Sequence, residues 1–332
     1  MTKQPTVLVT GGAGYVGSHA CKALHRSGLT PVTLDNLSTG YREAVKWGPL
    51  EIGDVRDEGL IADIMVRHKI TAVLHFAALS LVGESGARPI EYYDNNLTGT
   101  ISLVAAMRRC GIGRIVFSST CAVYGTPRTL PILETEATQP INVYGRTKLA
   151  VEHFLSDMAA TGAIRAVLLR YFNAAGADGD GDIGEAHSPE THLVPLAIQA
   201  GLRSDRPLSI FGTDYPTADG TCERDYVHVE DLADAHLRAL SFLDAQGGSH
   251  AFNLGTGQPV SVRRVVQAVE RVLGARVPVI EAPRRIGDPP RLFAAPGRAE
   301  GDLKWVATRS DIDSIVESAA RWHRSNVFLE AV

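Results

Sequence analysis

The first half of the chain alternates short apolar segments with longer segments in which apolar residues recur at helical spacing. The apolar segments are rich in Val, Ile and Leu, as in TVLVT at residues 6–10, which is typical of strands buried in a parallel sheet. We predict strands at residues 6–10, 31–35, 49–53, 71–76, 114–118 and 164–171. We predict helices at residues 15–27, 57–68, 89–109 and 143–160. This alternation predicts an α/β fold with a doubly wound parallel sheet.

The pattern changes in the second half of the chain. Residues 174–190 are rich in Gly, Asp and Ala, which predicts a mobile loop or lid. Short helices and strands follow, and a helix at 229–245 with a strand at 251–254 is expected to return to the first sheet. The predicted domains are a Rossmann domain over residues 1–175, to which segments near 225–255 return, and a smaller mixed α/β domain over residues 176–332.

A glycine-rich turn directly follows the first predicted strand. Gly11, Gly14 and Gly17 are spaced by three residues and lead into the first predicted helix. Glycines let such a turn be tight, let backbone N–H groups approach a pyrophosphate, and let the helix pack closely on the strand. The helix N-terminus then faces the phosphates with the positive end of its dipole. An ordinary loop is the weaker interpretation, because a second strand with a terminal acid follows the helix.

Two acids at predicted strand ends bear on which nucleotide binds. Asp35 ends the second strand, where a carboxylate accepts hydrogen bonds from ribose hydroxyls and repels a 2′-phosphate. The sequence therefore predicts NAD as the cofactor in preference to NADP. Asp54 ends the third strand and is predicted to contact the adenine. Both acids also fit simple turns, and the segment from Asn36 to Gly40 is turn-like.

A Tyr–Lys pair at helical spacing is the main candidate for catalysis. Tyr144 and Lys148 lie four residues apart in a predicted helix, so their side chains share one face. A phenol titrates near pH ~10, and a nearby ammonium favours its anionic form, which lets it act as a base near neutral pH. Alone, this spacing is more often structural. The glycine turn and the hydroxyl-rich strand end Ser118, Ser119 and Thr120 reverse that judgement.

Composition limits the other classes of function. The 332 residues include 45% hydrophobic residues and carry a net charge of −4, as in an ordinary soluble globular protein. No basic block suggests a nucleic-acid groove, no apolar run is long enough to span a membrane, and residues 1–5 resemble no targeting peptide. The cysteines show neither metal-binding nor pairing patterns and are expected to be free thiols in a reducing cytoplasm: Cys21, Cys110, Cys121 and Cys222. No metal is predicted.

Taken together, the motifs resemble the extended short-chain dehydrogenase/reductase family, and within it the UDP-sugar 4-epimerases. The matching segments span almost the whole chain: VTGGAGYVGSH, LDNLSTG, HFAA, VGES, YYDNN, FSSTCAVYG, YGRTK, LLRYFNAAGA, IFGTDYPTADGTCERDYVHVEDLADAH, FNLGTGQ and PRRIGDPP. The resemblance implies tightly held NAD and epimerisation at C4 of a UDP-sugar through a transient 4-keto sugar. UDP-glucose and UDP-galactose are the expected pair. It also implies a homodimer through the helices predicted at 89–109 and 143–160.

The resemblance also implies roles for individual residues. Tyr144 takes the proton of the C4 hydroxyl, Lys148 lowers the pKa of Tyr144 and holds the nicotinamide ribose, and Thr120 hydrogen-bonds the reacting oxygen. The cofactor-binding residues also include Gly11, Gly14, Tyr15, Val16, Gly17, Asp35, Asn36, Leu37, Ser38, Thr39, Gly40, Asp54, Val55, Phe76, Ala77, Ala78, Ser80, Asn95, Ser118 and Phe172. The UDP-sugar contacts also include Asn173, His192, Leu193, Phe211, Arg224, Tyr226, Arg285, Asp288 and Leu292.

Three positions depart from the commonest family pattern. Ser80 stands where many relatives carry a Lys that reaches the cofactor, which weakens the expectation of tight retention. His192 stands where better-known members have an Asn near the phosphates, and a His can also donate there. Leu292 occupies the position of the residue that gates the far end of the sugar pocket.

The sequence bears on three alternative functions. Sugar-nucleotide dehydratases and decarboxylases usually carry an acid at the position of Ala122, so elimination is disfavoured. 4-Epimerases of UDP-xylose, UDP-glucuronate or UDP-N-acetylhexosamines remain open. A non-catalytic NAD-sensing protein on the same fold usually loses the Tyr or the Lys, and this chain keeps Tyr144 and Lys148.

Overall fold

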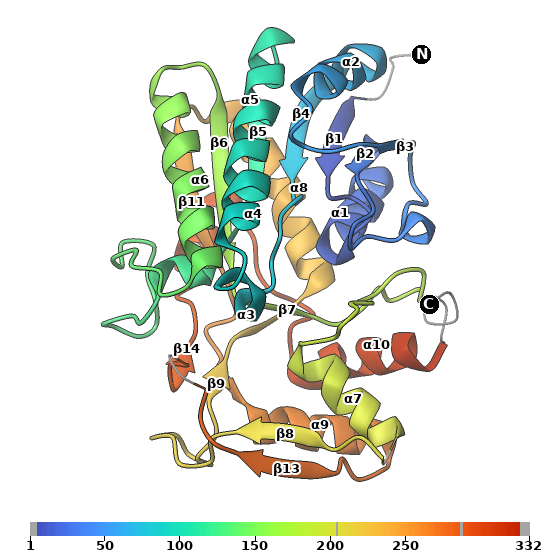
Figure 1. The fold of residues 1–332 in the computed structure, drawn as a ribbon, viewed down its shortest axis with the longest axis vertical. Coiled ribbons are helices and arrows are strands. Elements are labelled where there is room, and N and C mark those ends of the chain that lie inside the picture. Colours follow the sequence, from blue (N-terminus) through green and yellow to red (C-terminus); the bar gives the residue numbers. More distant parts are fainter. Residues whose placement is uncertain (1–4, 204, 286–287, 326–332) are drawn as a thin grey trace.

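A seven-stranded parallel sheet with helices on both faces forms the upper part of the molecule in Figure 1. The computed structural model describes residues 5–203, 205–285 and 288–325. The strand order is β11-β6-β5-β4-β1-β2-β3. The strands are β1 (Thr6–Thr10), β2 (Thr30–Asp35), β3 (Leu50–Ile52), β4 (Ile70–His75), β5 (Arg114–Thr120), β6 (Arg165–Tyr171) and β11 (Ser249–Leu254). The predicted doubly wound parallel sheet is confirmed.

Each face of the sheet is buried under its own set of helices. Side chains alternate along β1, so that Val7 and Val9 join one apolar cluster and Leu8 joins the other. The first cluster lies under α1 (Tyr15–Arg26) and α8 (Val229–Ala245). The second lies under α2 (Glu58–His68), α5 (Gly99–Arg109) and α6 (Val143–Ala160). Burial on both faces explains why the strands read as nearly continuous apolar runs.

The helix predicted over residues 89–109 is divided into three segments. A π-helical turn, η2 (Asp94–Thr98), separates α4 (Pro89–Tyr93) from α5. The buried Asn96 amide accepts from Leu79 N (2.8 Å) and donates to Leu79 O and to Thr147 Oγ1 (3.0 Å each). These contacts with residues outside the helix stabilise the π-helical turn. The periodicity of apolar residues gives no sign of such contacts. A short helix, α3 (Val82–Ser85), precedes this region.

A smaller group of helices and strands lies below the sheet in Figure 1. Helices α7 (Leu193–Leu202), α9 (Val262–Leu273) and α10 (Ile312–Ser325) share one apolar cluster. The short strands pair in three small sheets: β7 (Asn173–Ala175) with β10 (Tyr226–His228), β8 (Leu208–Phe211) with β13 (Val279–Ala282), and β9 (Glu223–Arg224) with β12 (Val260–Ser261) and β14 (Arg291–Leu292). The remaining short elements are η1 (Arg42–Ala44), η3 (Cys121–Tyr124) and the π-helical η4 (Ala299–Leu303). The C-terminal domain predicted from the sequence runs to residue 332, and residues 286–287 and 326–332 lie outside the described residues.

The loop after β7 is irregular, as predicted, but it is not loosely packed. Ala177 and Ile183 are fully buried and contact Trp322 of α10. Lys22 of α1 donates to three aspartates of the loop, Asp178, Asp180 and Asp182, at 2.6, 2.9 and 2.8 Å. The small and acidic residues of this loop therefore anchor it to α1 and α10. Residue spacing along the chain does not reveal these contacts.

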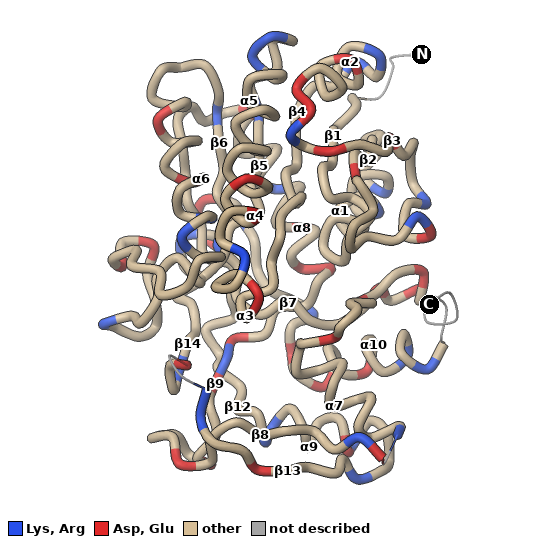
Figure 2. Tube along the Cα trace, in the orientation of Figure 1, with Lys and Arg blue, Asp and Glu red and all other residues tan. Residues whose placement is uncertain are grey.

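Charged residues of both signs are interspersed along the trace in Figure 2. Within the described residues, no helix combines the length and the apolar character needed to cross a membrane.

A buried ion pair ties α6 to the sheet close to the carboxyl end of β5. Arg170 of β6 donates to Glu152 of α6 from Nε (2.9 Å) and Nη2 (2.5 Å). Both side chains are almost fully buried. Ser119 of β5 donates to the same carboxylate at 2.5 Å. The pair therefore fixes the strand end that carries Ser118 and Thr120.

Arg170→Leu is expected to lower the free energy of unfolding by about 3–5 kcal/mol, because it leaves Glu152 as an uncompensated buried charge. The double variant Arg170→Leu/Glu152→Gln removes that charge and should recover part of the loss. Urea unfolding of the wild type and both variants measures this. A double variant that is no more stable than the single one would contradict the buried-charge explanation.

Candidate active site

One cavity of about 390 Å³ opens at the carboxyl ends of the central strands. It lies where the strand order reverses between β1 and β4, the place at which doubly wound sheets bind ligands. Its lining includes most of the predicted cofactor and catalytic residues: Gly11, Gly14, Tyr15, Val16, Gly17, Asp35, Asn36, Ser38, Thr39, Gly40, Val55, Phe76, Ala77, Ala78, Ser80, Asn95, Ser118, Thr120, Tyr144, Lys148 and Phe172. Asn173 and His192 line it as well.

The glycine turn has no room for side chains at two positions. A Cβ on Gly11, which has a φ of +73°, would lie 2.6 Å from the backbone N of Ala77. A Cβ on Gly17 would lie 2.2 Å from the Gly11 carbonyl oxygen. The turn ends at Gly14, the N-cap of α1, and the first turn of α1 contains no acid. The first backbone N–H groups of a helix have no partner within it, so this end of α1 fits a phosphate group.

Asp35 lies at the end of β2 beside this turn. Its carboxylate accepts from Ala13 N at 3.0 Å and from Leu37 N at 2.9 Å, and it lines the cavity. Burial raises the pKa of Asp35, and these two hydrogen bonds oppose the shift. Each carboxylate oxygen keeps a lone pair that can accept from a ribose hydroxyl. With the glycine turn, these residues fit an adenosine dinucleotide.

Two of the predicted cofactor residues do not line the cavity. Asp54 instead accepts from Arg56 Nε (2.8 Å) and Nη2 (2.7 Å), which hold the pKa of Asp54 down to about 2. Its neighbours Gly53 and Val55 form the cavity wall at this point. Leu37 turns back with a φ of +58° to donate its N–H to Asp35. Asp54 and Leu37 therefore shape the turn that surrounds the cavity.

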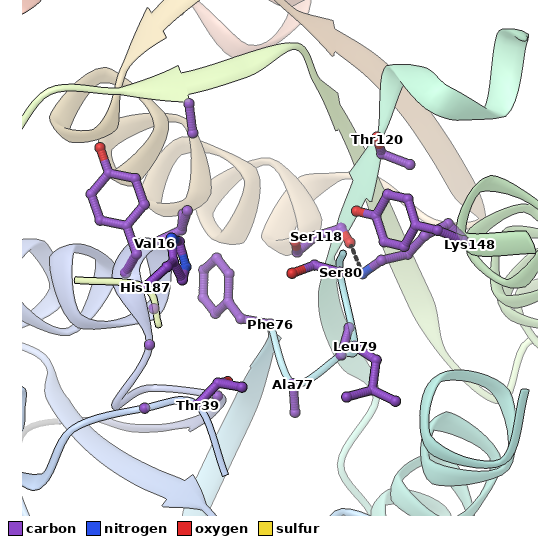
Figure 3. A pocket seen from close by; sticks show the side chains of 18 of the residues that line it. Val16, Thr39, Phe76, Ala77, Leu79, Ser80, Ser118, Thr120, Lys148 and His187 are labelled. Atoms are coloured by element: carbon purple, nitrogen blue, oxygen red, sulfur yellow. Dashed lines mark hydrogen bonds between the residues drawn. The ribbon is translucent and has the colours of Figure 1, made fainter. Parts of the chain in front are cut away.

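Tyr144, Lys148 and Thr120 meet on the other side of the cavity. Figure 3 shows Thr120 and Lys148 facing Val16 and His187 across it. The helix begins at Val143 because the Asn142 side chain caps it by accepting from Gly145 N at 2.8 Å. Lys148 Nζ donates to the Ser118 carbonyl at 2.8 Å and lies 5.9 Å from the centre of the Tyr144 ring. Thr120 Oγ1 accepts from Ala122 N at 3.1 Å and lines the cavity together with Tyr144.

Burial dominates the protonation of this group. It raises the pKa of Tyr144 well above its usual value, and the Thr120 hydroxyl opposes the shift. It also lowers the pKa of Lys148 to about 7, against the charge of Glu152. Within the protein alone, desolvation thus dominates the pKa of the phenol.

The remaining predicted substrate residues do not line this cavity. Arg224 Nη2 is paired with the carboxylate of Asp288, and the Arg285 guanidinium lies 4.0 Å from the centre of the Phe211 ring. Pairing of β9 with β14 sets Leu292 opposite Arg224. Leu292 packs against the apolar cluster that contains Phe172, a residue of the cavity wall. Tyr226 is buried in β10, and Leu193 begins α7.

The cavity also contains residues that the sequence reasoning missed. Tyr171 hydrogen-bonds Ser118 through its hydroxyl, beside Lys148. Glu185 and His187 line the wall that His192 completes. Burial opposes a charge on His192, but hydrogen bonds to Glu185 and Glu190 raise its pKa to about 10. The pattern Glu-x-His-x-x-Glu-x-His at residues 185–192 was the available signal, and all of it except His192, which was predicted, lay in the segment 174–190 predicted as a mobile loop.

The chain was compared with known proteins. The family described as "NAD dependent epimerase/dehydratase family" matches residues 7–255. A UDP-glucose 4-epimerase of Rhizobium leguminosarum bv. trifolii is 51% identical over 318 residues, which cover 96% of this chain and 97% of that protein. Another UDP-glucose 4-epimerase, from Azospirillum brasilense, is 50% identical over 97% of this chain and 92% of that protein.

Solved structures agree with the sequence relatives. The UDP-glucose 4-epimerase of Brucella ovis in complex with NAD has a TM-score of 0.92 and 49% identity, covering 95% of this chain and 97% of that one. The enzyme of Stenotrophomonas maltophila, with bound NAD and formylated UDP-arabinopyranose, has a TM-score of 0.94 and 43% identity, covering 97% and 98%. The chain therefore belongs to the NAD dependent epimerase/dehydratase family.

Proposed function

We propose that this chain interconverts UDP-glucose and UDP-galactose by inverting C4 of the sugar through a transient 4-keto sugar. The observation that carries this is the convergence of Tyr144, Thr120 and Lys148 at one end of a cavity whose other end is the glycine turn. The 51% identity to a UDP-glucose 4-epimerase over 96% of this chain supports the choice of sugar. Ala122 at the position of the dehydratase acid supports epimerisation over elimination.

Three side chains would handle the proton at sugar O4. The Tyr144 phenol accepts it when C4 is oxidised and returns it when the alcohol reforms. Thr120, which lines the cavity with Tyr144, holds the reacting oxygen beside the phenol. Lys148, bound to the Ser118 carbonyl at 2.8 Å, donates to the nicotinamide ribose and contributes positive charge when protonated. Thr120 and Lys148 are buried and Tyr144 is partly buried, which limits the access of water to the three groups.

The cofactor would lie along the cavity from the glycine turn to Lys148. Gly11, Gly14 and Gly17 hold the pyrophosphate, and Asp35 accepts from the adenosine ribose and excludes NADP. When bound, NAD supplies the hydride acceptor for C4 and a positive charge that favours the phenolate. Ser80 lines the cavity without adding a charge, so retention of the cofactor rests on the remaining contacts.

The UDP portion would bind toward the smaller C-terminal part of the molecule. Arg224 and Arg285 provide guanidinium groups for the pyrophosphate, and Phe211 provides an apolar surface for the uracil ring. This assigns residues 1–175, with the segment near 225–255, to NAD and the rest of the chain to UDP-sugar. Before substrate binds, the ion pair with Asp288 holds the Arg224 side chain in place. When UDP-sugar binds, Arg224 must exchange this bond for one to phosphate.

A panel of substrates tests the proposed reaction. The purified protein is incubated with UDP-galactose, UDP-xylose, UDP-galacturonate and UDP-N-acetylgalactosamine, without added NAD, and products are separated by chromatography. The highest specificity constant is expected for UDP-galactose. A higher value for UDP-xylose or UDP-galacturonate would reassign the substrate, and no epimerisation of any sugar would reject the function.

We further propose that the chain works in the cytoplasm as a homodimer. Exposed apolar side chains on the helical segment 89–109, namely Ile90, Tyr93 and Ile101, support a helical interface. Sedimentation analysis of the purified protein should give twice the mass of the chain. A monomer at micromolar concentration would contradict the dimer.

Tyr144→Phe is expected to reduce kcat by roughly 10²–10⁴-fold, the usual contribution of a general base. The ring still fills its partly buried site, so UDP binding and NAD content should stay close to those of the wild type. Turnover is measured with UDP-galactose, and binding by calorimetry with UDP. Near-normal turnover would show that Tyr144 is not the base.

Thr120 is expected to act through its hydroxyl, so Thr120→Ser should keep most activity while the nearly isosteric Thr120→Val loses it. A hydrogen bond to a charged group contributes about 1.5–3 kcal/mol. That corresponds to roughly a 10- to 100-fold loss for the Val variant, at about 1.4 kcal/mol per factor of ten. Equal rates for the Ser and Val variants would rule out this role.

Leu292 is expected to bias the enzyme against sugars with an N-acetyl group at C2. An acetamide placed against leucine is left without a partner, which costs about 1–3 kcal/mol. Leu292→Ser should therefore raise the specificity constant for UDP-N-acetylgalactosamine relative to that for UDP-galactose by up to about 100-fold. Leu133→Ser, at an exposed leucine, is the control. An unchanged ratio in Leu292→Ser would mean that Leu292 does not face the C2 substituent.

A further inference from the structure

Four side chains of types that can bind a metal converge across the cavity from Lys148, and all but Glu190 line the cavity. They belong to one short segment before α7: Glu185, His187, Glu190 and His192. One ligand atom from each lies within 4.8 Å of the other three. Glu185 Oε1 lies 3.0 Å from His187 Nδ1 and 2.6 Å from His192 Nδ1. Glu190 Oε1 lies 4.0 Å from His187 Nδ1 and 3.3 Å from His192 Nδ1.

These separations match those of a small tetrahedral metal site. Bonds of about 2.0–2.2 Å from Zn²⁺ to imidazole nitrogen or carboxylate oxygen place neighbouring ligand atoms about 3.4 Å apart. The four imidazole–carboxylate separations, from 2.6 to 4.0 Å, lie on both sides of that value. Small side-chain rotations would therefore open the centre for an ion, and the backbone of the segment can stay in place.

The chemistry of the set selects a class of metal. With both imidazoles neutral, as metal ligands must be, the set carries a charge of −2, which one divalent cation neutralises; the cation takes the place of the proton that His192 otherwise shares with Glu185 and Glu190. Imidazole nitrogen favours Zn²⁺, Co²⁺ and similar ions over Mg²⁺ and Ca²⁺, which prefer oxygen. The side chains of Glu185 and Glu190 are only 4% and 7% exposed. Two carboxylates this buried need positive charge close by, which a protonated His192 supplies without metal and a bound cation would supply in its place.

The surroundings contain a further buried imidazole. His323 of α10 is 8% exposed, and neither ring nitrogen has a hydrogen-bond partner among the described residues. Glu185 and Glu190 act on it electrostatically. The adjacent Trp322 donates from Nε1 to the Glu185 carbonyl at 2.8 Å, which holds α10 against the segment. The cluster is thus fixed on two sides, by its own bonds and by α10.

We propose that Glu185, His187, Glu190 and His192 bind one divalent transition-metal ion of the Zn²⁺ class in the cavity wall. The ring of His187 lies edge-on to that of Tyr15, with 6.3 Å between ring centres, so the ion lies close to the start of α1. A cation there adds to the positive end of α1 and attracts phosphate groups entering the cavity. The proposal does not depend on which sugar the enzyme converts.

A second cluster in the same loop provides an internal contrast. Asp178, Asp180 and Asp182 also bring three carboxylate oxygens within 4.8 Å of one another. Lys22 Nζ donates to all three at 2.6–2.9 Å, so an ammonium already occupies the place of a cation. We expect no transition metal at this cluster.

Titration with Co²⁺ and Zn²⁺ tests the site. The protein, with its nucleotide bound, is first dialysed against a chelator and then against metal-free buffer. Co²⁺ should give the intense visible absorption of a four-coordinate ion, saturating at one ion per chain, and Zn²⁺ should displace it. An absorption spectrum identical to that of hydrated Co²⁺ would overturn the proposal without any variant.

Variants locate the ion once it is bound. Loss of a residue that only supports a ligand costs roughly 10- to 100-fold in metal affinity, so His187→Ala and His192→Ala are each expected to cost at least about 100-fold. His25→Ala, at an exposed histidine, and Asp180→Asn, in the Lys22 cluster, should bind as the wild type does. Unfolding midpoints confirm that each variant is folded. Wild-type affinity in the His187→Ala/His192→Ala variant, or loss of binding in Asp180→Asn, would overturn the proposal.

Discussion

The contact between two backbone segments, Gly11 and Phe76–Ala77, is the constraint on which the active site depends. The Thr10 carbonyl accepts from the N–H groups of Phe76 and Ala77 at 2.9 and 3.0 Å, and Gly11 N donates to the Leu34 carbonyl at 2.9 Å. The loops that leave β1, β2 and β4 are thereby joined at the point where the strand order reverses. A Cβ on Gly11 would be 2.6 Å from Ala77 N, so only glycine permits this arrangement. The start of α1, Asp35 and the cavity wall are all placed by it.

Features defined by local spacing could be predicted from the sequence. The glycine turn, Asp35 at a strand end and the Tyr144–Lys148 pair each lie within or directly beside one regular element, where chain geometry fixes the position. Asp54 could not be placed in the same way, because its carboxylate turns to Arg56, whose reach depends on side-chain rotamers. The π-helical turn follows from contacts of Asn96 with Leu79 and Thr147, which lie on other segments. Tyr171 and the Glu185–His192 segment join the cavity only through tertiary packing.

Burial sets the resting state of the catalytic group. Desolvation raises the pKa of Tyr144 and lowers that of Lys148 to about 7, so it favours the neutral form of both residues. The group therefore needs positive charge from what binds in the cavity before the phenol can act as a base. Glu152, which pairs with Arg170, opposes this effect on Lys148, because its negative charge favours the ammonium. The contacts that position Tyr144 and Lys148 therefore also set their pKa values.

The central claim is that hydride leaves and returns to the same sugar carbon within one bound complex, with the proton handled by Tyr144. UDP-galactose carrying deuterium at C4 tests this most directly. The enzyme converts it without added NAD, and the UDP-glucose formed is analysed by mass spectrometry and NMR. The account predicts that deuterium is retained at C4 of the product. Loss of the deuterium to solvent, or a requirement for stoichiometric added NAD, would contradict it.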